Sequence, residues 1–298
     1  MAYRVSQGLQ TLARQPAVHV ASSRLTWPTT ARFVLYGKPL PRAEAALRVG
    51  EALRSAAMGQ AKWLLGDAQQ VPEISGHDLP AGNRHAHAFW LPEPNAQGVI
   101  DHVLVHAPGG FSPAAQQVLQ ALRQVRWGDG DPLRVMLEGL GQVTDLAVHA
   151  RPLAASTVWR SVTPYLHPRH LKPRELRTQP DREAAVLAQL QREWQARAAE
   201  VVPLLSAKPL PELSFEGRSL HVLHFERFRR KRGLLQPDTQ GRFLELRFAV
   251  PVSGPVALGF GCHFGLGLFV PVDDLSDPAA SIAGRLADHK SVNYCRPP

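Results

Sequence analysis

The sequence contains little cysteine and no long apolar run. Only Cys262 and Cys295 occur among 298 residues, which excludes a disulfide scaffold and a cysteine-rich zinc site and fits a reducing compartment. No uninterrupted apolar run reaches about 18 residues, so we expect no membrane partner. Residues 1–4 lack the apolar core of a signal peptide. We therefore expect a cytoplasmic protein.

Several enzyme signatures are also absent. The sequence has no Gly-x-Ser-x-Gly elbow, no His-Glu-x-x-His helix and no Gly-Lys-Ser/Thr phosphate loop. Hydrophobic residues make up 44% of the chain, which is enough for a packed core and excludes global disorder. The chain is long enough for two domains of ordinary size.

Acidic residues are outnumbered by basic ones, and the net charge is +9. Residues 1–150 hold 13 basic and 11 acidic side chains, whereas residues 151–298 hold 21 and 14. Such an excess suggests a polyanionic partner such as nucleic acid or anionic lipid, bound mainly by the second half. Lysine is scarce, with six residues against 28 arginines. Guanidinium groups suit phosphates and bases, although a GC-rich genome would explain the bias equally well.

The first half predicts a ferredoxin-like unit. Residues 1–29 show no clear period and are expected to form an N-terminal arm. Alternation and helical spacing predict strands at 30–36, 85–91, 100–106 and 133–140, and helices at 42–58 and 113–125, the second capped by Ser112. This order, β-α-β-β-α-β, defines a first domain over residues 30–150. We expect both helices on one face of the sheet and the other face free for a partner.

A second, looser copy of the pattern follows over residues 151–272. We predict strands at 156–163, 220–228, 243–250 and 264–270 and a helix at 183–199. Residues 273–298 form a polar C-terminal tail. The predicted fold class is therefore α+β, with two tandem ferredoxin-like (RRM-like) domains and a glycine-rich loop near the C-terminus.

The glycine-rich loop, residues 259–269, alternates glycine with apolar residues. Glycine allows a positive φ and a close approach of another backbone, and exposed N–H groups can hold phosphate oxygens. The alternative is a glycine-rich strand that packs tightly on a helix. The candidate RNA-binding residues of this loop are Gly259, Gly261, His263, Gly265 and Gly267.

Histidines are concentrated in residues 83–90. On a strand, His85 and His87 would point to the same face, beside Arg84. Two imidazoles can share acid–base work without a metal, and the nearest carboxylates make no recognised metal-ligand spacing. The alternative is a pair of hydrogen-bonded histidines that pack a sheet. His77 is a weaker candidate in a loop.

Two clusters of basic residues lie in the second half, and aromatic residues lie beside them. Phe225 and Phe228 adjoin the second cluster. Basic groups interleaved with aromatics suit phosphate and base contacts. The alternative is a solvated hairpin tip. The expected RNA contacts are Arg169, Lys172 and Arg174 in the first cluster and Arg227, Arg229, Arg230, Lys231 and Arg232 in the second.

These features together resemble the repeat-associated RNA-binding superfamily of CRISPR systems. Residues 30–35, 84–87, 101–111 and 263–269 look like the processing-nuclease portion of the fused subunit of type I-G (formerly I-U) systems, which joins a Cas-five-like to a Cas-six-like part. The similarity covers about residues 30–272. The last motif is typical of the superfamily, and the first three are more specific to this branch.

The resemblance implies an endoribonuclease of antiviral defence. It would cleave precursor CRISPR RNA within each repeat, without metal or other cofactor, by attack of the ribose 2′-OH, and leave a 2′,3′-cyclic phosphate and a 5′-OH. The protein would then retain the 3′ repeat end of the crRNA in an effector complex, beside backbone and Cas-five-like subunits. A general base and a general acid are required, and histidine suits both roles.

The catalytic position departs from the family pattern. Many relatives carry a histidine after the first strand, but residues 37–58 contain none. The catalytic candidates are therefore His85, His87 and His77. The alternative function is a non-catalytic RNA-binding subunit of a CRISPR effector complex.

Overall fold

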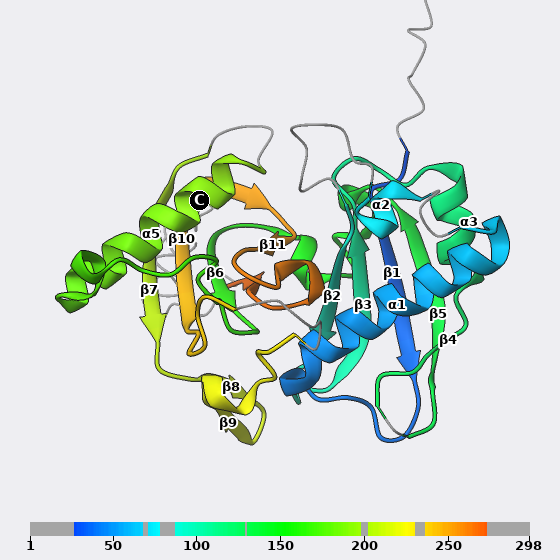
Figure 1. Ribbon diagram of the computed structural model, residues 1–298, viewed down its shortest axis with the longest axis horizontal. Coiled ribbons are helices and arrows are strands. Elements are labelled where there is room, and N and C mark those ends of the chain that lie inside the picture. Colours follow the sequence, from blue (N-terminus) through cyan, green and yellow to red (C-terminus); the bar gives the residue numbers. More distant parts are fainter. Residues whose placement is uncertain are drawn as a thin grey trace, which may run out of the picture.

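The computed structural model describes residues 27–67, 71–77, 87–128, 130–197, 202–229 and 236–272. Two sheets lie side by side, each with its own long helix (Figure 1). Most of the predicted N-terminal arm and the whole predicted C-terminal tail lie outside the described residues.

The first sheet contains five antiparallel strands in the order β2-β3-β1-β5-β4. Its first four strands have the order expected of a ferredoxin-like unit. Its elements are β1 (Thr30–Tyr36), η1 (Ala43–Ala45), α1 (Ala46–Leu65), α2 (Pro72–Ser75), β2 (Phe89–Pro94), β3 (Ile100–His106), α3 (Pro113–Ala121), β4 (Gln124–Val125) and β5 (Leu133–Gly141).

Most of the predicted elements of this half are confirmed, with shifted ends. β1 and β3 have the predicted bounds, and the Ser112 hydroxyl accepts a hydrogen bond from the Ala115 N–H at the start of α3. The second strand begins at Phe89 rather than at residue 85, so His87 precedes the strand. α3 ends at Ala121, because the chain turns there to add the short strand β4 to the sheet edge.

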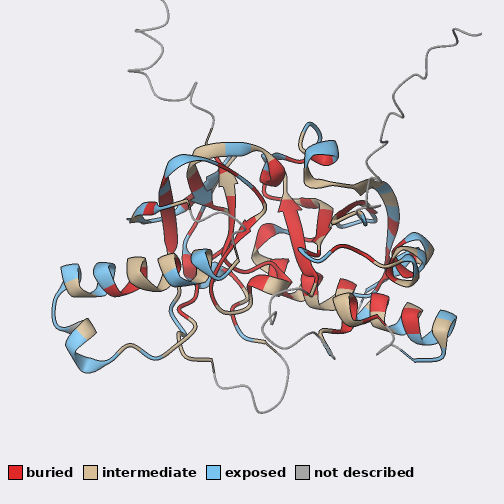
Figure 2. Ribbon diagram, turned by 90° about the horizontal axis from the view of Figure 1, so that it is seen from above, coloured by how far each residue is buried: buried red, intermediate tan, exposed pale blue. Residues whose placement is uncertain are grey.

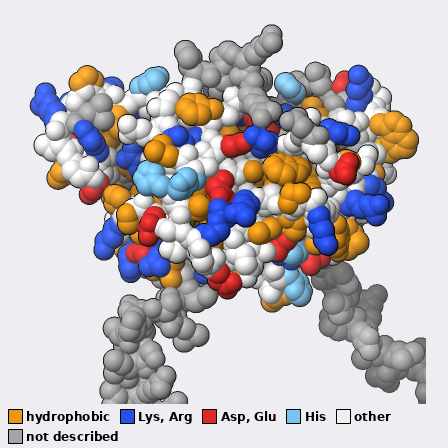
Figure 3. All heavy atoms as spheres, turned by 90° about the horizontal axis from the view of Figure 1, so that it is seen from below, with side chains coloured by type: hydrophobic (Ala, Val, Ile, Leu, Met, Phe, Trp, Pro, Cys, Tyr) orange, Lys and Arg blue, Asp and Glu red, His pale blue; other side chains and the backbone are white. Residues whose placement is uncertain are grey.

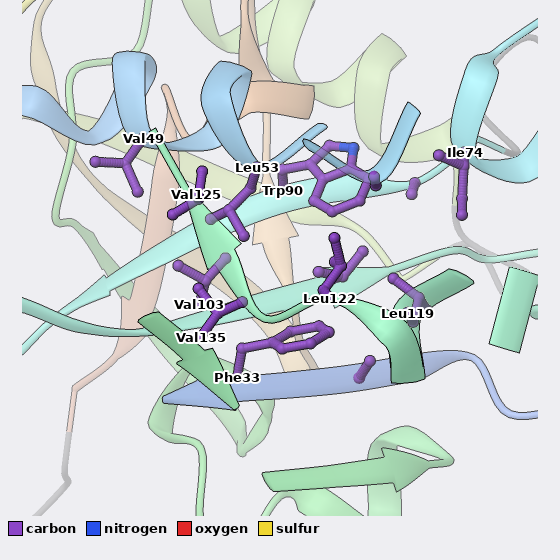
Figure 4. Close-up of a cluster of buried hydrophobic side chains, with 14 of the residues drawn as sticks. Phe33, Val49, Leu53, Ile74, Trp90, Val103, Leu119, Leu122, Val125 and Val135 are labelled. Atoms are coloured by element: carbon purple, nitrogen blue, oxygen red, sulfur yellow. The ribbon is translucent and has the colours of Figure 1, made fainter. Parts of the chain in front are cut away.

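An apolar core fills the space between this sheet and its helices (Figure 4). Phe33 of β1, Leu53 of α1 and Trp90 of β2 are fully buried in it. Alternating residues of a strand face opposite sides of a sheet. Arg32 therefore lies on the other face, where its Nε is 3.0 Å from the buried carboxylate of Glu93. Burial of these apolar side chains holds α1 against the sheet.

The second sheet is also antiparallel, with the strand order β11-β12-β6-β10-β7. A separate hairpin, β8-β9, projects from it. The elements are α4 (Val143–Leu146), η3 (Arg151–Leu153), β6 (Ala155–Ser161), η4 (Pro173–Leu176), α5 (Gln179–Gln195), β7 (Leu204–Leu210), β8 (Leu213–Phe215), β9 (Arg218–Leu220), η5 (Val222–His224), β10 (Phe243–Ser253), β11 (Val256–Ala257), η6 (Cys262–Phe264) and β12 (Leu268–Pro271).

Predictions for this half were less accurate. The strand expected at 220–228 is wrong, because β9 ends at Leu220 and the chain then forms the 3-10 turn η5 and an irregular segment. The last strand begins at Leu268, because Gly265 and Gly267 adopt left-handed backbone conformations before it. Thr178 caps α5, where its hydroxyl accepts from the Asp181 N–H. Both long helices carry buried residues on one side and exposed residues on the other (Figure 2).

The expected free face of the first sheet is partly covered. Phe89, Leu91 and Leu104 of the first half share a buried cluster with Ala257 and Leu268 of the second. The turn η6 contacts both α1 and β2. The glycine-rich loop thus joins the two halves. None of the described helices combines the length and the apolar character needed to cross a membrane.

Candidate functional site

A cleft lies where α1, α2, the residues before β2 and the glycine-rich loop meet. It contains two adjoining hollows of about 310 Å³ and 350 Å³, which share Arg54, Arg229 and Phe264. Three of the segments singled out in the sequence therefore contribute to one site. The residues lining the two hollows are Glu51, Arg54, Ser55, Met58, Ser75, Gly76, His77, His87, Arg229, Gly261, His263 and Phe264.

Helix α2 brings His77 and His87 to the same hollow. The helix ends at Ser75, and the left-handed conformation of the capping residue Gly76 (φ 72°) turns the chain toward His77. The main-chain N–H of Ala88 donates to the carbonyl of Glu73 at 2.6 Å, which joins the start of β2 to α2. A Cβ atom at Gly76 would lie 3.5 Å from the ring of His87. His87 therefore does not lie on the predicted strand. The short helix α2 and the hydrogen bond from Ala88 to Glu73 position it instead.

The imidazole of His263 is held between two other rings. Its centroid is 3.7 Å from that of His87, with the planes 11° apart, and 3.9 Å from that of Phe89, with the planes 20° apart. Its Nδ1 lies 3.4 Å from the carbonyl oxygen of Ala88. His263 occupies η6, which is bounded by residues of positive φ at Gly261 and Gly265. The glycine-rich loop therefore covers one face of the His87 ring with the imidazole of His263.

The stacked imidazoles of His87 and His263 both line the cleft. An imidazole can act as a general acid or as a general base. Within the described part of the chain, no three His, Cys, Asp or Glu side chains are grouped as metal ligands.

The cleft is also lined by two guanidinium groups, those of Arg54 and Arg229. That of Arg229 lies 4.2 Å from the ring centroid of Phe264 and that of Arg54 lies 5.9 Å from it. Arg229 Nε donates to Glu51 at 2.6 Å, and Arg54 donates to the carbonyl of Ser75. Burial, and the charge of Arg229 beside it, lower the pKa of Arg54 below its ordinary value. One carboxylate faces two guanidiniums, so an anion between them would be stabilised.

Residues 221–229, which we call the strap, place Arg229 in the cleft. The strap lies along α1. Glu226 pairs with Arg48 of α1, and Arg229 pairs with Glu51. Just before the strap, Arg218 pairs with Glu44 of η1 in the same way. Ion pairs between two chain segments fix their register more than they add stability.

Sequence reasoning missed Arg54 and Glu51. The sequence feature that could have identified them is their spacing. Glu51 and Arg54 are three residues apart and therefore face the same side of α1. Nothing in the sequence indicated that the strap would cover this face. The pairing between the strap and α1 is a long-range contact that periodicity does not report.

The four glycines of the loop are closed off by the protein itself. A Cβ atom at Gly265 would lie 2.5 Å from Cδ of Pro92, and one at Gly267 would lie 1.8 Å from the carbonyl oxygen of Leu258. Gly259 and Gly261 are similarly crowded, by Leu166 and Leu266. The packing alternative therefore accounts for glycine at these positions. Contact between the loop and RNA stays a prediction.

The predicted basic residues are divided among different surroundings. The guanidinium of Arg227 is buried and donates to the carbonyls of Thr239 and Gln240. Its expected contact with RNA stays a prediction. Arg169 makes two bonds to Glu175, of 2.9 and 2.7 Å, which lower the pKa of Glu175 to about 2.

Lys172 and Arg174 are exposed at η4 and do not line the cleft. Seen from below, Lys and Arg side chains are spread out and interspersed with Asp and Glu (Figure 3). The remaining predicted site residues, Arg84, His85, Arg230, Lys231 and Arg232, lie outside the described residues.

Comparison with known proteins gave structural similarities only. No family model matches the sequence, and no curated protein matches it. Among solved structures, a Cas6 product complex is 14% identical with a TM-score of 0.43, covering 82% of this chain and 99% of that one. A CRISPR-associated protein Cas6 is 10% identical with a TM-score of 0.44, covering 82% and 98%. The CRISPR RNA processing endoribonuclease Cas6b is 11% identical with a TM-score of 0.36, covering 82% and 99%. Each of these TM-scores is below 0.5.

Proposed function

We propose that this chain is an endoribonuclease that cleaves precursor CRISPR RNA within its repeats at the cleft described above. The observation that carries the proposal is the convergence of His87, His263 and Arg229, which come from three separate segments, on one hollow. Imidazoles and guanidiniums in one site can supply the acid, the base and the positive charge that transfer of an RNA phosphodiester requires. The choice of CRISPR RNA as the substrate rests on the sequence motifs that resemble the CRISPR processing nucleases.

The reaction needs no metal ion in this scheme. A base removes the proton of a ribose 2′-OH, whose oxygen then bonds to the adjacent phosphorus. The bond from phosphorus to the 5′-oxygen breaks, and an acid protonates that oxygen. The products are a 2′,3′-cyclic phosphate and a 5′-OH. His87 carries one proton transfer, and His77, which lines the same hollow, is the candidate for the other.

The remaining cleft residues have supporting roles. Arg54 and Arg229 offset the charge that develops on the phosphoryl oxygens, as fixed positive groups do best in a partly buried site. His263 is stacked on both ring faces and holds His87 in place. His85, two residues before His87 in the chain, is a further candidate for general acid or base.

We extend the proposal to the context of the protein. The two sheets are interpreted as tandem ferredoxin-like domains that meet near residue 150, with the second helix of the second unit reduced to β11 and η6. The chain acts as the Cas-six-like part of a type I-G system and retains the 3′ repeat end of the crRNA beside backbone and Cas-five-like subunits. Processing of CRISPR RNA would place the protein in the cytoplasm.

The test is cleavage of end-labelled repeat RNA by the pure protein in EDTA. Cleavage at one phosphodiester with a 2′,3′-cyclic phosphate end is expected. His87→Ala should slow it about 100-fold or more while binding is nearly unchanged. His149→Ala is the matched control, because His149 is exposed and does not line the cleft. Parental rates in the His87, His77 and His85 variants would refute the assignment.

A non-catalytic RNA-binding subunit is the second candidate. The observation in its favour is that His263 and the loop glycines are engaged in packing, as a purely structural loop would be. Tight binding of repeat RNA without cleavage in the same assay would support this candidate over the nuclease.

A further inference from the structure

Side chains of the strap alternate between the interior and the solvent. Phe225 is 4% exposed and Arg227 is 9% exposed, whereas Phe228 between Arg227 and Arg229 is 58% exposed. The Phe225 ring packs on Phe243 with the centroids 5.6 Å apart. Of the two phenylalanines in the strap, one therefore contributes to the core and the other exposes its ring to solvent. Exposure of an apolar ring is unfavourable, and core packing does not account for it.

The ring of Phe228 is supported from the protein side. The guanidinium of Arg227 lies 5.7 Å from the ring centroid. That guanidinium is itself fixed, since its Nη1 donates to the carbonyls of Thr239 and Gln240. A cation near an aromatic ring attracts its π-electrons and restricts its motion. Phe228 is thus a partly immobilised aromatic surface rather than a freely rotating side chain.

Phe228 directly precedes a cleft residue in the chain. The next residue, Arg229, lines both hollows and lies against Phe264. Adjacent residues therefore offer a flat aromatic ring and a guanidinium directed at an anion site. Proteins that hold single-stranded nucleic acid combine these two groups, with bases stacked on aromatic rings and the backbone following basic residues.

We propose that Phe228 is a stacking platform for an unpaired RNA base next to the cleft. This deepens the proposed function and rests on it, because RNA is taken as the ligand of the cleft. Stacking tolerates every base, so Phe228 would position the strand and leave sequence specificity to other contacts. It would hold the nucleotide beside the phosphate that Arg54 and Arg229 bind.

The test measures binding of a single-stranded oligoadenylate by fluorescence anisotropy. Phe228→Ala should weaken binding about tenfold, and Phe228→Tyr, which keeps the ring, should restore it. Leu223→Ala is the matched control, because Leu223 lies on the same strap and is 65% exposed. Its affinity should equal that of the parent. A duplex RNA of the same length should bind equally to all four proteins, since paired bases cannot stack on the ring.

A second measurement covers the case in which Phe228→Ala disturbs the strap. In Phe228→Trp, a base stacked on the indole should quench its fluorescence when oligoadenylate is saturating. Unchanged emission, or a parental affinity of Phe228→Ala for oligoadenylate, would overturn the proposal and favour a protein partner at this ring. The proposed function is judged separately by cleavage of repeat RNA in EDTA, so the failure of one is distinguishable from the failure of the other.

Discussion

Replacing Gly50 by alanine should separate α1 from the glycine-rich loop. Gly50 is buried in the second turn of α1. A Cβ atom there would lie 2.5 Å from the carbonyl oxygen of Phe264 and 2.9 Å from that of Trp90. Both contacts are main-chain atoms, which cannot rotate away as a side chain does. The helix, the loop or β2 must therefore move by several tenths of an ångström or more.

The magnitude follows from two opposing effects. Overpacking of a tight contact costs about 1–3 kcal/mol, and the absence of a flexible neighbour places this contact near the upper end. Alanine in place of glycine inside a helix recovers about 1 kcal/mol. We expect Gly50→Ala to lower the free energy of unfolding by about 2 kcal/mol. Each kcal/mol corresponds to about 2–4 °C in Tm for a protein somewhat smaller than this one.

The same helix supplies the control. Gly59 is exposed in α1, and a Cβ atom there would have no other atom within 4 Å. Gly59→Ala should therefore raise the free energy of unfolding by about 0.5–1 kcal/mol. Urea unfolding of both variants measures whether the free energy of unfolding rises or falls. Cleavage of repeat RNA should decline only in Gly50→Ala, because His263 moves with the loop. Stabilisation by both substitutions would refute the reasoning.

Three further outcomes are expected. Thr178→Ala should lower the free energy of unfolding, measured in urea, by about 1 kcal/mol, since it removes the cap of α5. Burial lowers the pKa of His106 to about 4 from 6.5, so the unfolded chain binds a proton that the folded chain does not. The free energy of unfolding that His106 contributes above pH 6.5 should fall by about 3 kcal/mol on acidification to pH 4. His106→Gln should remove this contribution to the difference between unfolding curves measured at the two pH values. Arg54→Gln and Arg229→Gln should each reduce the slope of log K against log salt for RNA by at most about 0.7, and an unchanged slope would show that the residue contacts no phosphate.

Periodicity predicted the elements that are stabilised by burial on one face. β1 and β3 each send alternating apolar side chains, such as Phe33 and Val103, into the first core, and the prediction matched their bounds. The same rule failed at residues 220–228. Those residues alternate because Phe225 and Arg227 face the interior while ion pairs hold the strap on α1, without any sheet. Alternation indicates burial on one side, and it does not identify the partner.

The site was predicted in its parts and missed in its assembly. His87, His263 and Arg229 were named from local composition. Their convergence depends on the contact between the two halves, which no local pattern contains. Arg54 was missed because a charged residue on a helix looks solvated until the strap is known to cover that face.

Helix α1 connects the fold of this protein to its proposed chemistry. Its buried face enters the first core, Gly50 meets the loop that carries His263, and Glu51 holds Arg229. A change that loosens α1 would therefore separate the imidazoles from the guanidiniums and abolish activity without touching a reacting group. Loss of cleavage alone cannot identify a catalytic residue in such a site. The decisive variants are those, such as His87→Ala, that lose cleavage while the free energy of unfolding and the affinity for RNA stay at parental values.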